Sequence, residues 1–113
     1  MAEQLRGPTG RAFAAIAETR LPTIAMIHGY CIGGGLGIAL SCDIRVAADH
    51  STFAIPAAKL GLAYPLEGTH RLVEIVGPSF AKEIFYTARQ FSAEEALHMG
   101  LINRSVSAKD LEL

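Results

Sequence analysis

The sequence predicts an α/β fold, because short apolar segments typical of buried parallel strands alternate along the chain with segments of helical periodicity. Three successive glycines, Gly33 to Gly35, separate the first predicted strand from the first buried helix. Right-handed crossovers are expected between the parallel strands. Half of the 113 residues are apolar and no repeat or linker interrupts them, so residues 1–113 are expected to form one domain or part of one.

The elements of the N-terminal half follow from the spacing of apolar residues and from glycine and proline. Phe13 and Ile16 share one face of the first helix, which ends before Pro22. The glycine triplet permits a sharp turn and leaves the first N–H groups of the next helix unpaired. The predicted elements are a helix at 11–19, strands at 23–28, 44–48 and 52–55, a helix at 35–42, and a turn-rich loop or single helical turn at 59–65.

The C-terminal half is predominantly helical in its pattern. Gly77 and Pro78 separate two predicted helices, at 69–76 and 78–88. Ser92 followed by Glu95 forms a capping box, and Gly100 occupies the position of a left-handed C-terminal residue, which predicts a helix at 93–99. A strand at 101–106 closes the series.

Composition argues against several classes of function. The net charge is −1 and the basic residues are scattered, so no nucleic-acid partner is expected. Cys31 and Cys42 lack the companions needed for a disulfide framework or a zinc site and are expected to be reduced thiols, and the four histidines lack metal-ligand spacing. Residues 1–10 are polar and lack the apolar stretch of a signal peptide, so a cytoplasmic location is expected.

A membrane span is an alternative interpretation of residues 24–42. This nineteen-residue run is apolar except for a few residues, and its glycines include a GxxxGxxxG series. The same glycines weaken a single long helix, and Asp43 and Arg45 follow directly within the next predicted strand. A strand, a glycine turn and a short buried helix therefore explain the run better, and no membrane partner is expected.

Several spaced segments together form a pattern: LPTIAMIHGYCIGGGLGIALSCD at 21–43, IRVAA at 44–48, FAIP at 53–56, LGL at 60–62, GT at 68–69, RL at 71–72, VGP at 76–78 and FSAEEALHMGLIN at 91–103. In these segments the chain resembles the enoyl-CoA hydratase/isomerase family, also called the crotonase family. The resemblance extends over about residues 21–106 and depends on many separate positions.

The resemblance implies a spiral of strand-strand-helix turns that binds acyl-coenzyme A thioesters and stabilises an enolate through two backbone N–H groups. By position, one of these donors belongs to Gly34, and Gly33, Gly35, Gly37 and Ala57 are expected to line the substrate site. The residues agree with this implication, because rigid N–H donors at a helix start stabilise developing negative charge. No cofactor is expected other than coenzyme A as part of the substrate.

The resemblance also implies that the chain is a partial crotonase-type fold. Members of the family are more than twice as long as this chain. The second oxyanion donor is expected upstream of Met1, and the C-terminal helical region used in trimer packing is expected after Leu113. The full-length form is expected to be a homo-oligomer, a trimer or hexamer, and this portion is expected to expose apolar faces.

The acid-base residues depart from the family pattern. Hydratases of the family carry two glutamates where this chain has Gly37 and Ala57, neither of which transfers a proton. Glu67 is the best nearby substitute, although a glutamate before a helix is also a common solvated N-terminal charge. Asp43 occurs in the family too, and we expect it to fix local hydrogen bonds at a strand start.

Two functions therefore remain open for the chain. It is either an acyl-CoA enzyme of the lyase/isomerase type, with Gly34 as oxyanion donor, or a catalytically silent acyl-CoA-binding or assembly relative, as Gly37 and Ala57 favour. A nucleotide-phosphate site lacks the GxGxxG or P-loop spacing, and Ser79 lies at a helix start instead of a nucleophile elbow. The sequence does not specify the acyl group.

Overall fold

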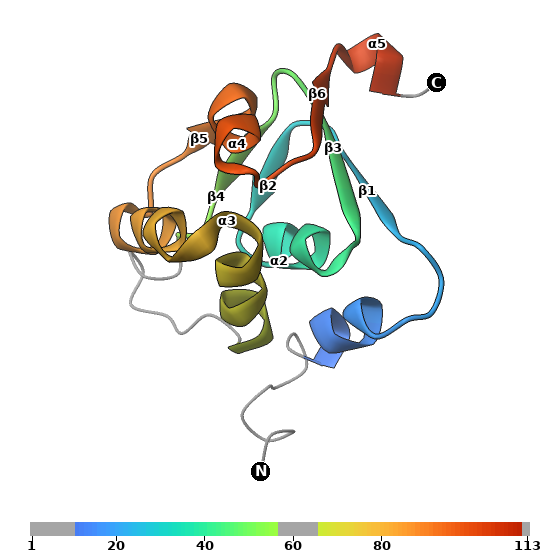
Figure 1. The fold of residues 1–113 in the computed structure, drawn as a ribbon. Helices are drawn as coiled ribbons and strands as arrows, with labels where there is room; N and C mark the ends of the chain where they lie inside the picture. Colours follow the sequence, from blue (N-terminus) through green and yellow to red (C-terminus); the bar gives the residue numbers. More distant parts are fainter. Residues whose placement is uncertain (1–10, 57–65, 112–113) are drawn as a thin grey trace.

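The computed structural model describes residues 11–56 and 66–111, without the side chains of residues 66–68. Figure 1 shows the strands and helices of this part of the chain. In chain order they are a helix at residues 11–17, β1 (Ile24–Ile27), β2 (Tyr30–Ile32), α2 (Gly34–Ser41), β3 (Ile44–Ala48), β4 (Thr52–Ala54), α3 (Leu66–Thr87), β5 (Phe91–Ser92), α4 (Ala93–Met99), β6 (Arg104–Val106) and α5 (Ala108–Leu111).

Two small sheets organise the strands. The first sheet has the strand order β1-β3-β6, and its neighbouring strands run parallel to each other. In the second, of order β2-β4-β5, β2 pairs with β4 in parallel and β4 pairs with β5 antiparallel. The pairs β1-β2 and β3-β4 each contribute one strand to each sheet and are each followed by a helix, whereas α4 lies between β5 and β6 (Figure 1). This arrangement confirms the α/β class and the partial spiral of strand-strand-helix units.

The structure corrects the predicted single strand at 23–28. The chain forms two strands, β1 and β2, because it bends at Gly29, whose φ is 91°. Such a positive φ is readily adopted only by glycine, and it directs the next residues into the second sheet. β2 has only three residues and lies next to the glycine triplet, so its periodicity was too short to predict a strand.

The C-terminal elements agree in type with the prediction and differ at their ends. The break between the two predicted helices is confirmed, since Gly77 has φ 83° and ψ 165° within α3. The predicted strand at 101–106 begins only at Arg104, because Leu101 and Ile102 are buried in the turn after α4. The two-residue β5 and the short α5 were not predicted, and the loop expected at 59–65 lies outside the described residues.

Both ends of α4 have the predicted caps. The Ser92 side chain accepts a hydrogen bond from the Glu95 N–H, and the Glu95 carboxylate accepts one from the Ser92 N–H. Gly100 adopts the left-handed conformation at the C-terminal end. A hydrogen bond from Arg89, together with the Ser92 N–H, lowers the pKa of Glu95 to about 2. The sequence therefore determined this helix locally.

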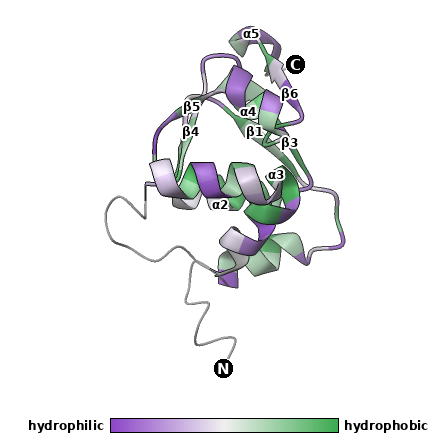
Figure 2. Cartoon of the chain, turned by 60° about the vertical axis from the view of Figure 1, so that its left-hand side comes forward, coloured by the Kyte–Doolittle hydropathy of each residue, from purple (hydrophilic) through white to green (hydrophobic). Residues whose placement is uncertain are grey.

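The core lies where α2 and α3 meet the two sheets. Figure 2 shows hydrophobic colour along the strands and hydrophilic colour on parts of α4. Burial of these large side chains supplies the main stabilising free energy, since each contributes about 1.5–3 kcal/mol. The most deeply buried apolar residues are Phe13, Leu36, Leu40, Phe53, Ile55, Leu72, Ile84, Phe91 and Leu101.

The nineteen-residue apolar run is divided into β1, β2 and α2, which contradicts the interpretation as one membrane span. Among the helices of the described residues, none has both the length and the apolar character needed to cross a bilayer. Large apolar side chains remain exposed along the start of the run, with Ile24 at 60% and Met26 at 58% exposure. β1 is the outer strand of its sheet within the described chain, so one of its edges has no neighbouring strand there.

We expect the Gly29→Ala substitution to lower the free energy of unfolding by about 1–2 kcal/mol, because an L-residue is strained at this φ although no atom blocks the new Cβ. Gly35→Ala is the matched control, since the same methyl group enters open space on an ordinary helical backbone. It is expected to stabilise the chain by about 0.5–1 kcal/mol. Urea denaturation of both variants measures the two changes, and equal effects would contradict the assigned bend.

Candidate functional site

The start of α2 is built around the backbone conformation of Gly33. This residue has φ 56° and ψ −119°, a combination that side chains disfavour, and it precedes the first helical residue, Gly34. Its N–H donates to the Ala54 carbonyl oxygen at 2.9 Å, and its own carbonyl accepts from the Gly37 N–H at 3.0 Å. The end of β4 and the first turn of α2 are thereby joined at one residue.

The Gly34 N–H is left as an available donor at this helix start. It has no acceptor among the residues that the structure describes, and Gly34 and Gly35 are both exposed. A Cβ added at Gly33, Gly34 or Gly35 would meet no described atom within 4 Å. α2 also has no acidic residue in its first turn and no side-chain hydrogen bond at its N-terminal cap, so nothing in the helix neutralises its positive end.

The structure brings four of the six predicted site residues together. Gly33, Gly34, Gly35 and Gly37 all belong to the first turns of α2 or its cap. Gly37 is buried, and its carbonyl accepts a hydrogen bond from the Ser41 hydroxyl at 2.9 Å. Gly37 has no side chain, and its N–H and C=O are both hydrogen-bonded within the helix or its cap. This position therefore contributes no proton-transfer group.

The other two predicted site residues are not located relative to the Gly34 N–H. Ala57 lies outside the described residues. Glu67 belongs to the first turn of α3, and its side chain also lies outside the described part. The predicted structural role of Asp43 is confirmed, because its carboxylate accepts hydrogen bonds from the Thr23 N–H at 2.9 Å and the Thr23 hydroxyl at 3.3 Å.

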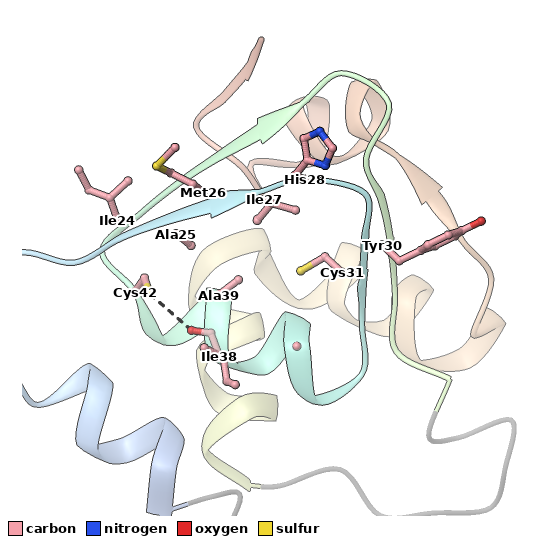
Figure 3. Close-up of a pocket in the computed structure, with 11 residues that line it drawn as sticks. Ile24, Ala25, Met26, Ile27, His28, Tyr30, Cys31, Ile38, Ala39 and Cys42 are labelled. Atoms are coloured by element: carbon pink, nitrogen blue, oxygen red, sulfur yellow. Dashed lines mark hydrogen bonds between the residues drawn. The ribbon is translucent and has the colours of Figure 1, made fainter. Parts of the chain in front are cut away.

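A cavity of about 470 Å³ lies between β1 and α2, next to this helix start. The sequence did not indicate it, because its lining comes from β1, β2 and α2 together and carries no motif. Figure 3 shows Ala25 and Ile27 directed toward α2, while Ile24 and Met26 point to the other face of β1. The lining is mostly apolar and includes Gly35, Ile38 and the thiols of Cys31 and Cys42.

Both cysteines are free thiols, as predicted. Cys31 is 6% exposed, and its burial raises the pKa of the thiol to about 11. Cys42 is half-buried and donates weakly to the Ile38 carbonyl oxygen, with 3.6 Å between sulfur and oxygen. Within the described residues, no cluster of three or more histidine, cysteine, aspartate or glutamate side chains is arranged to hold a metal ion.

The family is shown by comparison with known proteins. The model of the enoyl-CoA hydratase/isomerase family matches residues 2–113, and the chain belongs to this family. It is 39% identical over 101 residues to a crotonyl-CoA hydratase from Syntrophomonas wolfei, covering 89% of this chain and 39% of that protein. It is 42% identical over 108 residues to a carnitinyl-CoA dehydratase from Salmonella arizonae, covering 93% of this chain and 41% of that protein.

Solved structures agree with this assignment. A family member from Hyphomonas neptunium superposes with a TM-score of 0.86 at 44% identity, covering 90% of this chain and 39% of that one. DspI from Pseudomonas aeruginosa gives a TM-score of 0.88 at 36% identity, covering 96% of this chain and 42% of that one. The chain therefore spans about 40% of the length of these relatives and has a partial crotonase fold.

We expect Cys31 to react slowly with iodoacetamide. Raising the thiol pKa from 9.0 to about 11 lowers the thiolate fraction at pH 8 about 100-fold, and only the thiolate is nucleophilic. The rate is expected to rise with pH until the thiol titrates. Mass spectrometry of the Cys42→Ser variant isolates this reaction, and Cys31→Ser is the matched control. Alkylation of Cys31 at the rate of an ordinary exposed thiol would contradict the assigned burial.

Proposed function

We propose that this chain is the acyl-CoA-binding portion of a crotonase-type enzyme, and that the Gly34 N–H stabilises the enolate oxygen of a thioester. The observation that carries the proposal is the Gly34 N–H itself, which belongs to an exposed residue at the start of α2 and has no acceptor among the described residues. The similarity to a crotonyl-CoA hydratase and a carnitinyl-CoA dehydratase supports the choice of a coenzyme A thioester.

The chemistry follows from where charge develops. When a proton leaves the α-carbon, or when a nucleophile adds at the β-carbon, negative charge accumulates on the thioester oxygen. A donor already aligned with that oxygen stabilises the transition state more than the ground state, and loss of one such donor costs about 2.7–4 kcal/mol. The positive end of α2 adds to the same effect, because no acidic residue in its first turn offsets it.

The identity of the acid-base group determines the reaction type. Gly37 and Ala57 occupy the positions of the usual glutamates, so the proposed enzyme either uses another carboxylate, for which Glu67 is the candidate, or catalyses a reaction other than hydration. The remaining features of the proposal come from the family resemblance. They are coenzyme A carried only by the substrate, a homo-oligomeric full-length form and a cytoplasmic location.

The second candidate is a catalytically silent acyl-CoA-binding relative. The backbone of Gly37 favours it, since both polar groups of that residue are bonded inside α2 and no side chain is present. Such a protein would keep the oxyanion donor for binding and would lack the groups that move a proton.

Gly34→Pro is expected to remove the proposed donor with little damage to the fold. Proline is favoured at the first position of a helix and has no N–H. Gly34→Ala is the matched control, because it retains the N–H and its Cβ enters open space. With butyryl-CoA bound, we expect the infrared frequency of an isotope-labelled thioester carbonyl to be lowered in the parent and the alanine variant and to return toward its solution value in the proline variant.

The control for this test is acyl-CoA affinity, measured by titration calorimetry for all three chains. Unchanged carbonyl polarisation in a folded, butyryl-CoA-binding proline variant would overturn the assignment of Gly34. Absence of butyryl-CoA binding by the parent chain would count against the proposed ligand class itself.

The double substitution Gly37→Glu with Ala57→Glu distinguishes the two candidate functions. In the full-length form, we expect the parent protein to hydrate crotonyl-CoA at a negligible rate and the double variant to gain activity, since each acid-base group contributes about 10²–10⁴-fold. The pair Gly37→Gln with Ala57→Gln has the same shape without proton transfer and is the control. Hydration by the parent at a rate equal to the glutamate variant would instead favour another carboxylate, which Glu67→Gln then tests.

A further inference from the structure

α2 is a weak helix when considered alone. It has eight residues, and Gly34, Gly35 and Gly37 each lower its intrinsic stability by about 0.8–1.0 kcal/mol relative to alanine. No side chain caps its N-terminal end, and the described surroundings leave the Cβ positions of Gly33 to Gly35 open. The bond from the Gly33 N–H to the Ala54 carbonyl oxygen fixes the residue before the helix, and the orientation of the Gly34 N–H then also depends on contacts farther along the helix.

Arg45 supplies the first of these contacts. It belongs to β3, is 5% exposed, and extends its guanidinium across the C-terminal end of α2. Its Nη1 donates to the Cys42 carbonyl oxygen at 2.8 Å and to the Ala39 carbonyl oxygen at 3.4 Å. Its Nε donates to the Leu101 carbonyl oxygen at 2.7 Å, which joins the turn after α4 to the same cluster.

Arg71 supplies the second contact from another element. It belongs to α3, and its Nε donates to the Leu40 carbonyl oxygen at 2.8 Å. Its Nη2 donates to the Cys42 carbonyl oxygen at 3.2 Å, the same atom that Arg45 binds. Two guanidinium groups from β3 and α3 thus converge on the last carbonyl groups of α2.

This convergence has an electrostatic cost. Burial and then the nearby Arg71 lower the pKa of Arg45 from its ordinary value. Among the described residues, no carboxylate forms an ion pair with either guanidinium. Part of the compensation comes from the backbone, because the carbonyl groups at a helix C-terminus carry partial negative charge, and the nearby Asp43 carboxylate also favours the charged form of Arg45. Both positive charges are therefore directed at one end of one helix.

We propose that Arg45 and Arg71 are positioning residues that fix the direction of the Gly34 N–H by anchoring the opposite end of α2. The distance along the helix is about 12 Å, given eight residues at 1.5 Å each. A helix of this length moves as one body, so a firmly bonded C-terminal end restricts motion at its open N-terminal end. The proposal rests on the proposed function of Gly34 as an oxyanion donor.

The test uses Arg71, because the deeply buried Arg45 is needed more for folding. Arg71→Gln removes the positive charge and the pair of donors that reach the Leu40 and Cys42 carbonyl oxygens. Arg71→Lys retains the positive charge, and Arg89→Gln is the control. Arg89 is also a hydrogen-bonded arginine, but it contacts Glu83 and Glu95 instead of α2. The first readout is hydrogen exchange of the Gly37 amide, whose bond to Gly33 O closes the first turn of α2.

We expect Gly37 exchange to become about tenfold faster in Arg71→Gln, because a cation bonded to the last carbonyl groups of a helix stabilises that helix against local opening. Amides of β3 are expected to change less than twofold, Arg71→Lys to recover part of the Gly37 protection, and Arg89→Gln to leave it unchanged. An equal loss at Gly37 and in β3 means general destabilisation and would overturn the proposal. Unchanged Gly37 exchange in folded Arg71→Gln would do the same.

The second readout separates this proposal from the proposed function. With butyryl-CoA bound, Arg71→Gln is expected to weaken the infrared shift of the thioester carbonyl while its affinity for butyryl-CoA changes less than threefold, since only donor alignment is altered. If the parent itself shows no carbonyl shift, the function assigned to Gly34 fails, whereas the exchange data still decide whether Arg71 orders the start of α2. A full carbonyl shift in Arg71→Gln would overturn the positioning role.

Discussion

The hydrogen bond from the Gly33 N–H to the Ala54 carbonyl oxygen, 2.9 Å long, is the contact on which the candidate site depends. It fixes the residue before α2 at the end of β4, in a conformation with φ 56° that glycine readily adopts. Because this N–H is used by the sheet and the Gly37 N–H by the helix, the Gly34 N–H between them is left for another acceptor. The candidate site thus follows from the position of Gly33, which is hydrogen-bonded both to the end of β4 and to the first turn of α2.

The spiral arrangement determines the neighbours of this turn. β1 and β2 pair with β3 and β4 in the same relative order, so the strands next to α2 in the chain are joined to each other in both sheets. A backbone donor requires no particular side chain, which separates the stabilisation of charge from the transfer of protons.

Local signals predicted the elements that local interactions stabilise. The caps of α4 at Ser92, Glu95 and Gly100 are complete in the sequence, and the break at Gly77 follows from glycine and proline alone. β2 and β5 were missed because two or three residues carry no measurable periodicity and depend on pairing with β4. The cavity between β1 and α2 was missed for a related reason, since its lining is assembled from β1, β2 and α2 and forms only when these elements pack together.

By itself, the sequence determined the α/β class, the glycine turn, the capped helix and the resemblance to the enoyl-CoA hydratase/isomerase family. Each of these depends on residues that are neighbours in the chain or on a spaced pattern of residue types. Only the tertiary structure decided that Arg45 and Arg71 meet at the Cys42 carbonyl oxygen. The physical reason is that both arginines bind backbone carbonyl groups, which every residue possesses. The residue types at the acceptor positions therefore do not predict these hydrogen bonds. The bonds form only when the fold brings β3, α3 and the end of α2 together.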